Sequence, residues 1–274
     1  MVAPAPAATY TLTVAIQVPF QDMSPIEPDN QELTGKARLF GRWMPEGVET
    51  LLDVGCAYSY MLNRLGRKAR LVCGVEYDFE KLREARRRFP RIHHVCASGE
   101  ALPLQSGLMD VVTFFEVLEH VERQRRFLEE VHRVLRPAGR IILSVPNKGL
   151  AEPIDMDNLV FTPALKAAKR LGLFRHVSDY HLRHHRHYSV QDLEGLFDGL
   201  FHIERVYYGG LVANQIGFLL YKSGTVGLRL LGVGEDAPLM KRMEGWMNSV
   251  TNWDFEHTYG PRSDKLAVRA RRIG

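Results

Sequence analysis

Two acidic residues early in the sequence are spaced in a way that indicates a ligand with a sugar and a positive charge. Asp53 ends the apolar run LLD, and small residues follow it at Gly55, Ala57 and Ser59. Glu76 ends the next apolar run, about twenty residues later, where an acid suits a pair of ribose hydroxyls. A carboxylate at the loop entrance would repel a pyrophosphate, and it suits an ammonium group.

The loop after Asp53 differs from the two common phosphate-binding loops. Gly55-x-Ala57-x-Ser59 stands where a dinucleotide site has G-x-G-x-x-G, and no Gly-Lys-Ser/Thr follows. The predicted ligand therefore has an adenosine-like sugar and a cationic tail but no phosphates. S-adenosylmethionine has those parts.

Short apolar segments that alternate with helical ones must position these acids. This alternation predicts a parallel sheet with crossover helices, an α/β Rossmann-like doubly wound fold whose ligands bind outside the carboxyl ends of the strands. An antiparallel last strand and lid insertions complete the predicted fold. Strands are expected at 10–20, 50–54, 71–76, 92–96, 110–115, 140–145, 201–208 and 265–273, and helices at 30–44, 79–89, 124–136 and from Ser189 onward.

Local signals fix several helix ends. Ser189 and Asp192 form a capping box at the start of a helix. RPAG, with its proline and glycine, is expected to stop the helix at 124–136. In the helix at 79–89, Phe79, Leu82, Ala85 and Phe89 are expected on one stripe, and the arginines on a solvated face.

Four ordered motifs resemble the class I S-adenosylmethionine-dependent methyltransferases, and most closely the ubiquinone/menaquinone-type small-molecule subgroup. The resemblance covers residues 48–147, and more weakly 186–206 and 264–272. The motifs are LLDVGCAYSY, GVEYD, ASGEALPLQSGLMDVVTFFEVLEHV and LRPAGRIILSVPN.

The resemblance implies a role for each matching position. The methionine end of the cofactor would lie at the first loop, the ribose at the second acid and the adenine beyond it. The implied cofactor residues are Asp53, Gly55, Ala57, Glu76, Tyr77, Ser98, Gly99 and, on the sulfonium side, Glu116; His120 belongs to the Leu-Glu-His motif. Two positions depart from the pattern, because Ser98 replaces a common Asp and Ser59 replaces the third glycine.

Six segments are predicted. They are a tail and lid segment at 1–47, an S-adenosylmethionine-binding core at 48–147, an acceptor lid at 148–188, a continuation of the core at 189–208, a second acceptor lid at 209–263 and the last core strand at 264–274. The start MVAPAPAA is expected to be a mobile tail rather than a signal peptide.

Histidines cluster before Ser189, in the region that faces the acceptor in similar enzymes. A hydroxyl acceptor must lose a proton, and histidine is the usual base near neutral pH. His184, His185 and His187 are therefore candidate catalytic residues. A role in loop packing or helix entry remains open, whereas their spacing is poor for zinc and no metal site is predicted.

Two further features of the lid segments each have two interpretations. The basic residues at 166–187 either contact an anionic acceptor or form a solvated face. The aromatic residues Trp246, Trp253, Phe255 and Tyr259 either cover an apolar or sugar-like acceptor or form a small satellite core.

The predicted function is methyl transfer to a small-molecule acceptor, most consistent with a hydroxyl oxygen of a natural product, a sugar or a lipid-linked precursor. The lid insertions favour this function because they enclose a compact substrate. The alternatives are an RNA or protein methyltransferase, for which we see no appended binding module, and a non-catalytic S-adenosylmethionine-binding protein. The sequence leaves the oligomeric state open, with a homodimer as one alternative.

Composition is that of an ordinary globular protein, with 45% apolar residues, 25% charged residues and a net charge of +4 among 274 residues. This mild charge does not call for a nucleic-acid partner. No segment approaches the roughly 20 apolar residues of a membrane span. Cys56, Cys73 and Cys96 are expected to be buried thiols in a reducing cytoplasm.

Overall fold

The computed structural model describes residues 33, 35–150, 152–154, 158, 162–170, 185–211, 224, 228 and 237–274. The strand predicted at 10–20 and His184 lie outside the described residues. Among the described helices, none is long and apolar enough to cross a membrane.

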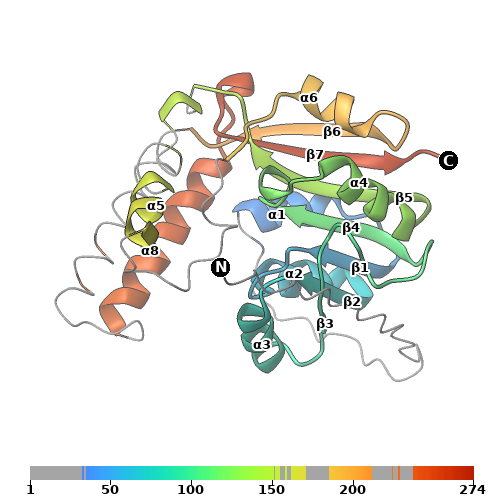
Figure 1. Ribbon diagram of the computed structural model, residues 1–274, viewed down its shortest axis with the longest axis horizontal. Coiled ribbons are helices and arrows are strands. Elements are labelled where there is room, and N and C mark those ends of the chain that lie inside the picture. The colour runs from blue at the N-terminus through green and yellow to red at the C-terminus, as the bar shows by residue number, and fades with distance from the viewer. Residues whose placement is uncertain are drawn as a thin grey trace, which may run out of the picture.

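A seven-stranded sheet forms the centre of the protein, in the order β3-β2-β1-β4-β5-β7-β6 (Figure 1). The first five strands are parallel, and β7 is antiparallel to both β5 and β6. This arrangement confirms the predicted doubly wound sheet with an antiparallel last strand. The strands are β1 (Val48–Val54), β2 (Ala69–Glu76), β3 (His93–Cys96), β4 (Met109–Phe115), β5 (Leu135–Pro146), β6 (Phe201–Gly209) and β7 (Lys265–Arg272).

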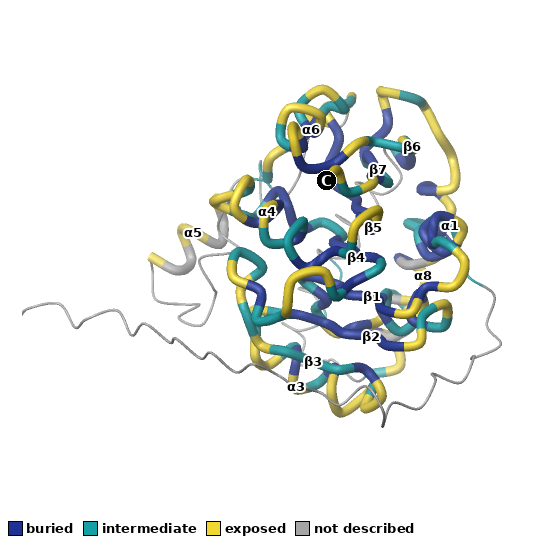
Figure 2. Tube along the Cα trace, turned by 90° about the vertical axis from the view of Figure 1, so that its right-hand side faces the viewer, coloured by how far each residue is buried: buried dark blue, intermediate teal, exposed yellow. Residues whose placement is uncertain are grey.

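Helices cover both faces of the sheet, and Figure 2 shows buried strands between helices with exposed outer sides. The crossover connections between parallel strands require this layered arrangement. The α-helices are α1 (Gly35–Trp43), α2 (Tyr60–Leu65), α3 (Phe79–Arg88), α4 (Gln124–Val134), α5 (Thr162–Arg170), α6 (Val190–Phe197) and α8 (Pro238–Phe255). Short 3₁₀ turns are η2 (Gly66–Lys68), η3 (Leu118–His120), η4 (Glu152–Ile154) and η7 (Gly260–Arg262).

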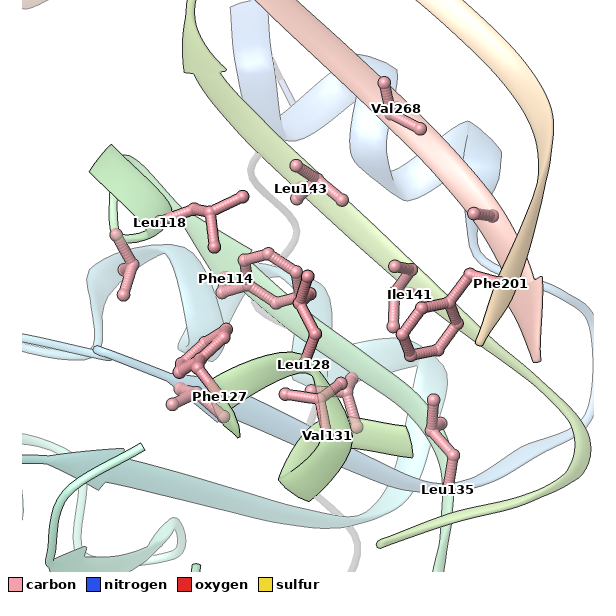
Figure 3. Close-up of a cluster of buried hydrophobic side chains, with 14 of the residues drawn as sticks. Phe114, Leu118, Phe127, Leu128, Val131, Leu135, Ile141, Leu143, Phe201 and Val268 are labelled. Carbon is pink, nitrogen blue, oxygen red and sulfur yellow. The ribbon is translucent and has the colours of Figure 1, made fainter. Parts of the chain in front are cut away.

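The core on one face of the sheet lies under α4 and α6. Phe114 of β4 meets Phe127 of α4 edge to face, with ring centroids 5.2 Å apart, and both rings are fully buried (Figure 3). Ile141 and Leu143 of β5 point to this face, whereas Ile142 between them points to the other. The alternation is the two-residue period of a strand buried on both sides.

The core on the opposite face contains apolar residues of α1, α2, α3 and the end of α8. Phe40 of α1 stacks on Phe115 at the tip of β4, with centroids 4.3 Å apart, and lies near Phe255 of α8. Through these contacts α1 packs against the carboxyl edge of the sheet, beside the end of β4.

Three details of the sequence prediction are wrong. The helix of the fourth crossover ends at Val134, and RPAG lies inside β5, where Ala138 has a φ of 59° and the pairing with β4 shifts register. The segment is a bulge that re-aims a long strand, and not a helix stop. Phe79 is 61% exposed because it is the first residue of α3, and Cys96 is exposed, whereas Cys56 and Cys73 are buried as predicted.

Candidate cofactor and acceptor site

Asp53 lies near the carboxyl end of β1 and is buried, with 3% of its surface exposed. Its Oδ1 accepts a hydrogen bond of 2.7 Å from the Thr113 hydroxyl on β4. Burial, together with the nearby Glu76 carboxylate and despite this hydrogen bond, raises the pKa of Asp53 to about 7. An uncompensated buried carboxyl group of this kind gains from a nearby cation.

Glu76 follows at the tip of β2, the next strand in the sheet. Its Oε2 accepts from the backbone N–H of Ala57 at 2.8 Å, and its Oε1 accepts from the backbone N–H of Asp78 at 2.9 Å. The carboxylate therefore holds the first loop against the second strand. We refer to Asp53 and Glu76 together as the acid pair.

Packing and backbone conformation within the protein explain why the residues of the first loop are small. Gly55 has a φ of 77°, and a Cβ built on it would lie 2.5 Å from a methyl of Val117. Ala57 and Ser59 also have positive φ values, which favour small residues. The loop is therefore shaped by close packing against the segment that follows β4.

Ser59, the residue that replaces the third glycine, does not narrow the loop toward a ligand. Its side chain is fully buried, and its hydroxyl shares a hydrogen bond of 2.9 Å with the His94 ring on β3. Burial lowers the pKa of His94 to about 4, so this bond joins two neutral groups at neutral pH.

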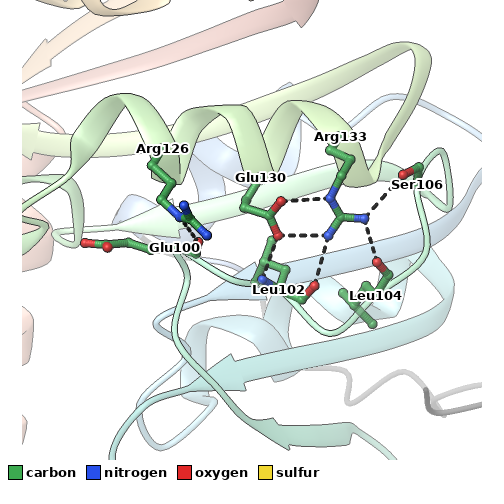
Figure 4. Close-up of polar contacts among 7 residues, drawn as sticks. All are labelled: Glu100, Leu102, Leu104, Ser106, Arg126, Glu130 and Arg133. Carbon is green, nitrogen blue, oxygen red and sulfur yellow. Dashed lines mark hydrogen bonds and ion pairs between the residues drawn. The ribbon is translucent and has the colours of Figure 1, made fainter. Parts of the chain in front are cut away.

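The loop that contains Ser98 and Gly99 is tied to α4. Figure 4 shows Glu130 and Arg133 binding the backbone of the segment after Gly99. Oε2 of Glu130 accepts from the N–H of Leu102 at 2.8 Å, and Arg133 donates to the carbonyl of Leu102 at 2.9 Å. A Cβ on Gly99 would lie 2.5 Å from the Phe127 ring, so glycine is required there by packing.

Ser98 and Tyr77, the other residues predicted near an adenine, lie at the surface. Ser98 accepts from the N–H of Glu100 at 3.2 Å, and Tyr77 is 74% exposed. Their contact with an adenine stays a prediction.

A fit to the predicted cofactor can be judged from the acid pair. The raised pKa of Asp53 marks a buried carboxyl group that an ammonium group would complement, and Glu76 is a partly exposed carboxylate at the next strand tip. Among the described residues, no lysine or arginine forms an ion pair with either of them. The donor set therefore fits S-adenosylmethionine, with its ammonium and ribose groups.

Glu116, just past β4, is ion-paired inside the chain. Its Oε2 lies 2.8 Å from Nζ of Lys265, its Oε1 lies 3.7 Å from Nζ of Lys36, and the Ser144 hydroxyl donates to Oε1 at 2.7 Å. Burial alone would raise the pKa of Glu116, but the two lysines outweigh it and hold that pKa below its usual range. We call Lys36, Glu116 and Lys265 the ion-pair cluster.

Sequence reasoning missed both lysines. Lys265 is the first residue of β7, and because β7 is antiparallel, its register with Pro146 puts it at the same edge as the carboxyl end of β5. Lys36 reaches the edge from α1. The predicted antiparallel direction of the last strand was the one available signal for Lys265, and nothing in the sequence indicated Lys36.

The predicted histidines are placed differently from one another. The His185 ring lies edge to face with His120, with centroids 4.6 Å apart, next to the Leu-Glu-His turn. His187, in contrast, lines an open pocket of about 440 Å³ together with Gln124 and Asp192. His184 lies outside the described residues, so a base role for any of the three stays a prediction.

A hydrogen-bonded bridge positions His185 and His187. The N–H of Tyr188 donates to the carbonyl of Pro146 at 2.9 Å, and the N–H of Lys148 donates to the backbone carbonyl of Tyr188 at 2.9 Å. The histidine segment is thereby fixed beside the end of β5. Within the described ranges, no group of three or more His, Cys, Asp or Glu residues is placed to hold a metal ion.

Comparison with known proteins matches this region to one family. Residues 52–143 match the family model described as a methyltransferase domain. The chain is 30% identical over 173 residues, 61% of this chain and 63% of the relative, to a probable S-adenosylmethionine-dependent methyltransferase of Mycolicibacterium smegmatis. It is 29% identical over 106 residues, 36% of this chain and 29% of the relative, to the mitochondrial ubiquinone biosynthesis O-methyltransferase of Mus musculus.

A solved structure has the same fold at lower identity. The [4+2]-cyclase SpnF superposes with a TM-score of 0.55 at 18% identity, over 87% of this chain and 80% of that one. The chain thus spans less than two thirds of the length of the relatives it matches in sequence. The described geometry and the sequence match together identify residues 52–143 as a class I S-adenosylmethionine-dependent methyltransferase domain.

Proposed function

We propose that this chain transfers a methyl group from S-adenosylmethionine to a hydroxyl oxygen of a small molecule. The observation that supports the donor is the acid pair, two carboxyl groups at neighbouring strand tips without an ion pair to a described lysine or arginine. When bound, the cofactor supplies a methyl group already activated on a sulfonium, so the protein has to bind, orient and handle a proton.

The chain's own residues divide this work. Glu76 would accept hydrogen bonds from the ribose hydroxyls while still holding the N–H of Ala57. Asp53 would neutralise the ammonium group from its buried position beside Thr113. Gly55 and Val117 fix the loop so that the two carboxyl groups keep their separation.

Two features support a compact acceptor. Helix α1 packs against the carboxyl edge through Phe40 and Phe115, and the end of α8 closes on the same helix through Phe255. Carboxyl and imidazole groups gather past β4, where a hydroxyl acceptor would need a proton acceptor. The relative from Mus musculus, whose name states an O-methyltransferase, agrees with an oxygen acceptor.

The test uses S-adenosylmethionine with a deuterated methyl group. The protein is incubated with separate pools of phenols, sugars, lipid-linked precursors, RNA and protein, and the label is located by mass spectrometry. The proposal predicts label on a hydroxyl oxygen of a small molecule, and less label with the Glu76→Gln variant at the same subsaturating cofactor concentration. Label in RNA or protein, or on nitrogen or carbon, would contradict it, as would cofactor binding without transfer to any pool.

A further inference from the structure

Glu119 is a buried acid that the proposed function has not yet used. It lies in η3, three residues after Glu116, and 3% of its surface is exposed. Its Oε2 is buried and has no hydrogen-bond partner among the residues that the structure describes. Buried polar atoms are almost always paired, so an unpaired carboxyl oxygen points to a partner supplied by a ligand.

The turn that contains Glu119 adjoins the first loop. Val117 packs on Gly55 so closely that a Cβ on the glycine would collide with it. Val117 joins the cofactor loop to the end of β4 through this contact, and Glu119 lies two residues after Val117 in the sequence. In the proposed function, the methyl end of the cofactor and the acceptor lie at this contact.

Burial and the Glu116 carboxylate favour the neutral form of Glu119 in the absence of ligand. Both lysines of the neighbourhood, Lys36 from α1 and Lys265 from β7, pair with Glu116, and the carboxylate of Glu116 repels a second negative charge. Burial first, and then Glu116, hold the pKa of Glu119 well above its usual range, although the lysines oppose them. His120 follows Glu119 in η3, and the Tyr188 hydroxyl donates to the carbonyl of Leu118 at 3.2 Å. Burial first, and also the nearby Glu119 carboxyl group, raise the pKa of Tyr188.

We propose that Glu119 accepts the proton of the acceptor hydroxyl, and that a bound cationic cofactor converts it from its neutral form to the carboxylate that can do so. The inference rests on the proposed function. A positive charge next to a carboxyl group favours the ionised form, and a sulfonium is such a charge. The neutral product S-adenosylhomocysteine lacks it.

The step balances in atoms and electrons. On cofactor binding, Glu119 releases its proton to solvent. In the transfer, the acceptor O–H bond breaks and its proton goes to the Glu119 carboxylate, while the oxygen forms a bond to the methyl carbon. The methyl–sulfur bond breaks, and its electron pair remains on sulfur as a neutral thioether.

The experiment measures protons released on binding and needs no acceptor. Isothermal titration calorimetry near neutral pH, in two buffers of different ionisation enthalpy, gives the proton count for S-adenosylmethionine and for S-adenosylhomocysteine. Both ligands have an ammonium group, so any proton released by Asp53 appears with both. The difference between the two ligands isolates a group that responds to the sulfonium.

We expect the wild type to release more protons with S-adenosylmethionine than with S-adenosylhomocysteine, by up to about one proton. The Glu119→Gln variant should lose this difference and keep the release common to both ligands. The matched control Glu194→Gln, on the exposed face of α6, should behave as the wild type. Equal release with the two ligands in the wild type, or a difference that survives in Glu119→Gln, would overturn the proposal.

A measurement on the wild type alone guards against a variant that fails to fold. Asp53 and Glu119 both contribute to the infrared carbonyl band of protonated carboxylic acids. S-adenosylmethionine should remove more of this band than S-adenosylhomocysteine, because both ligands act on Asp53 and only the first has a sulfonium. An equal loss of the band with the two ligands would also refute the role of Glu119. If neither ligand binds, the proposed function itself fails; if both bind without a difference, only the role of Glu119 fails.

Discussion

The carboxyl edge of the sheet has acids at two places, and the protein treats them in opposite ways. The acid pair at the tips of β1 and β2 receives hydrogen bonds from Thr113, Ala57 and Asp78 but, within the described part of the chain, no cation. In the ion-pair cluster beyond β4, Glu116 binds two lysines from distant parts of the sequence.

This difference separates a site built for a ligand from one that is complete in itself. A carboxyl group that the chain leaves without a cation is costly when buried, and a ligand with a positive charge removes that cost. An acid with its own lysine is already compensated and serves to fix the strands around it. Charge changes at the two places should therefore act on different quantities, ligand affinity at one and stability at the other.

The largest effect is expected in the ion-pair cluster. Lys265→Met keeps the volume of the side chain but removes the cation 2.8 Å from Glu116, in a position where the lysine side chain is only 16% exposed. Removing one partner of a buried ion pair costs about 3–5 kcal/mol. Urea unfolding should show this loss in the free energy of unfolding.

A matched control is Lys148→Met, which removes a lysine 2.9 Å from Asp192 at a site where its side chain is 45% exposed. Loss of this surface ion pair should lower the free energy of unfolding by less than about 1 kcal/mol. The double variant Lys265→Met with Glu116→Gln should recover most of the lost stability. An equal loss of unfolding free energy in the two lysine variants would contradict the claim that the ion-pair cluster stabilises the fold more than a surface ion pair does.

Replacing Asp53 of the acid pair by a neutral side chain should raise the free energy of unfolding, by an amount that depends on pH. The folded pKa of Asp53, about 7, is above the ordinary value of 3.8, so the folded chain binds this proton more tightly than the unfolded chain. The stability from this group is fully present below the unfolded pKa and is lost as pH rises through 7. Asp53→Asn stays neutral, so its unfolding free energy should exceed that of the wild type by about 2–4 kcal/mol at high pH.

The comparison uses urea unfolding of both proteins without ligand at a pH below the unfolded pKa of 3.8 and at a mildly alkaline pH. The two proteins should converge at the acidic value, and Asp198→Asn, an exposed control, should follow the wild type throughout. At the same time Asp53→Asn should weaken cofactor binding. A gain that is independent of pH would contradict the buried, uncompensated state of Asp53.

A smaller effect on affinity is expected from Glu76→Gln. The amide cannot accept from the ribose hydroxyls as the carboxylate would, and the lost hydrogen bonds should weaken the binding of S-adenosylhomocysteine by about 1–3 kcal/mol. Calorimetry measures this change, and Glu100→Gln serves as a control outside the acid pair. Unfolding is followed in parallel, because Glu76 also holds the loop. Unchanged affinity would refute the ribose assignment.

The smallest effect is expected at Ser59. Ser59→Gly relieves a positive φ of 59° but loses the hydrogen bond to His94, and the two effects oppose one another. The net change in the free energy of unfolding should stay within about 1 kcal/mol, with unchanged cofactor affinity. A large change in affinity would show that Ser59 faces the ligand after all.

Much of the fold was predictable because its signals are local. Apolar runs of strand length, the capping box at Ser189 and the acids at strand tips were each readable in the sequence. The RPAG segment was misread because a proline and a glycine after a helix mark a helix end and a bulge alike. The pairing partner that decides between them, β4, is distant in sequence.

The ion pairs and the burial of single side chains were not predictable in the same way. Lys36 and Lys265 meet Glu116 only after α1 and the antiparallel β7 have packed on the same edge. The unpaired oxygen of Glu119 is likewise a property of what surrounds it. Neighbours that are far apart in the sequence decide these features, and a single sequence does not specify them.

Titration of the purified protein with S-adenosylhomocysteine, followed by titration with an oxidised nicotinamide dinucleotide, tests the central claim most directly. The acid pair should bind the first ligand saturably and exclude the second, because the second has a diphosphate where Asp53 places a carboxyl group. Binding of the dinucleotide, or no binding of S-adenosylhomocysteine at saturating concentration, would contradict this account.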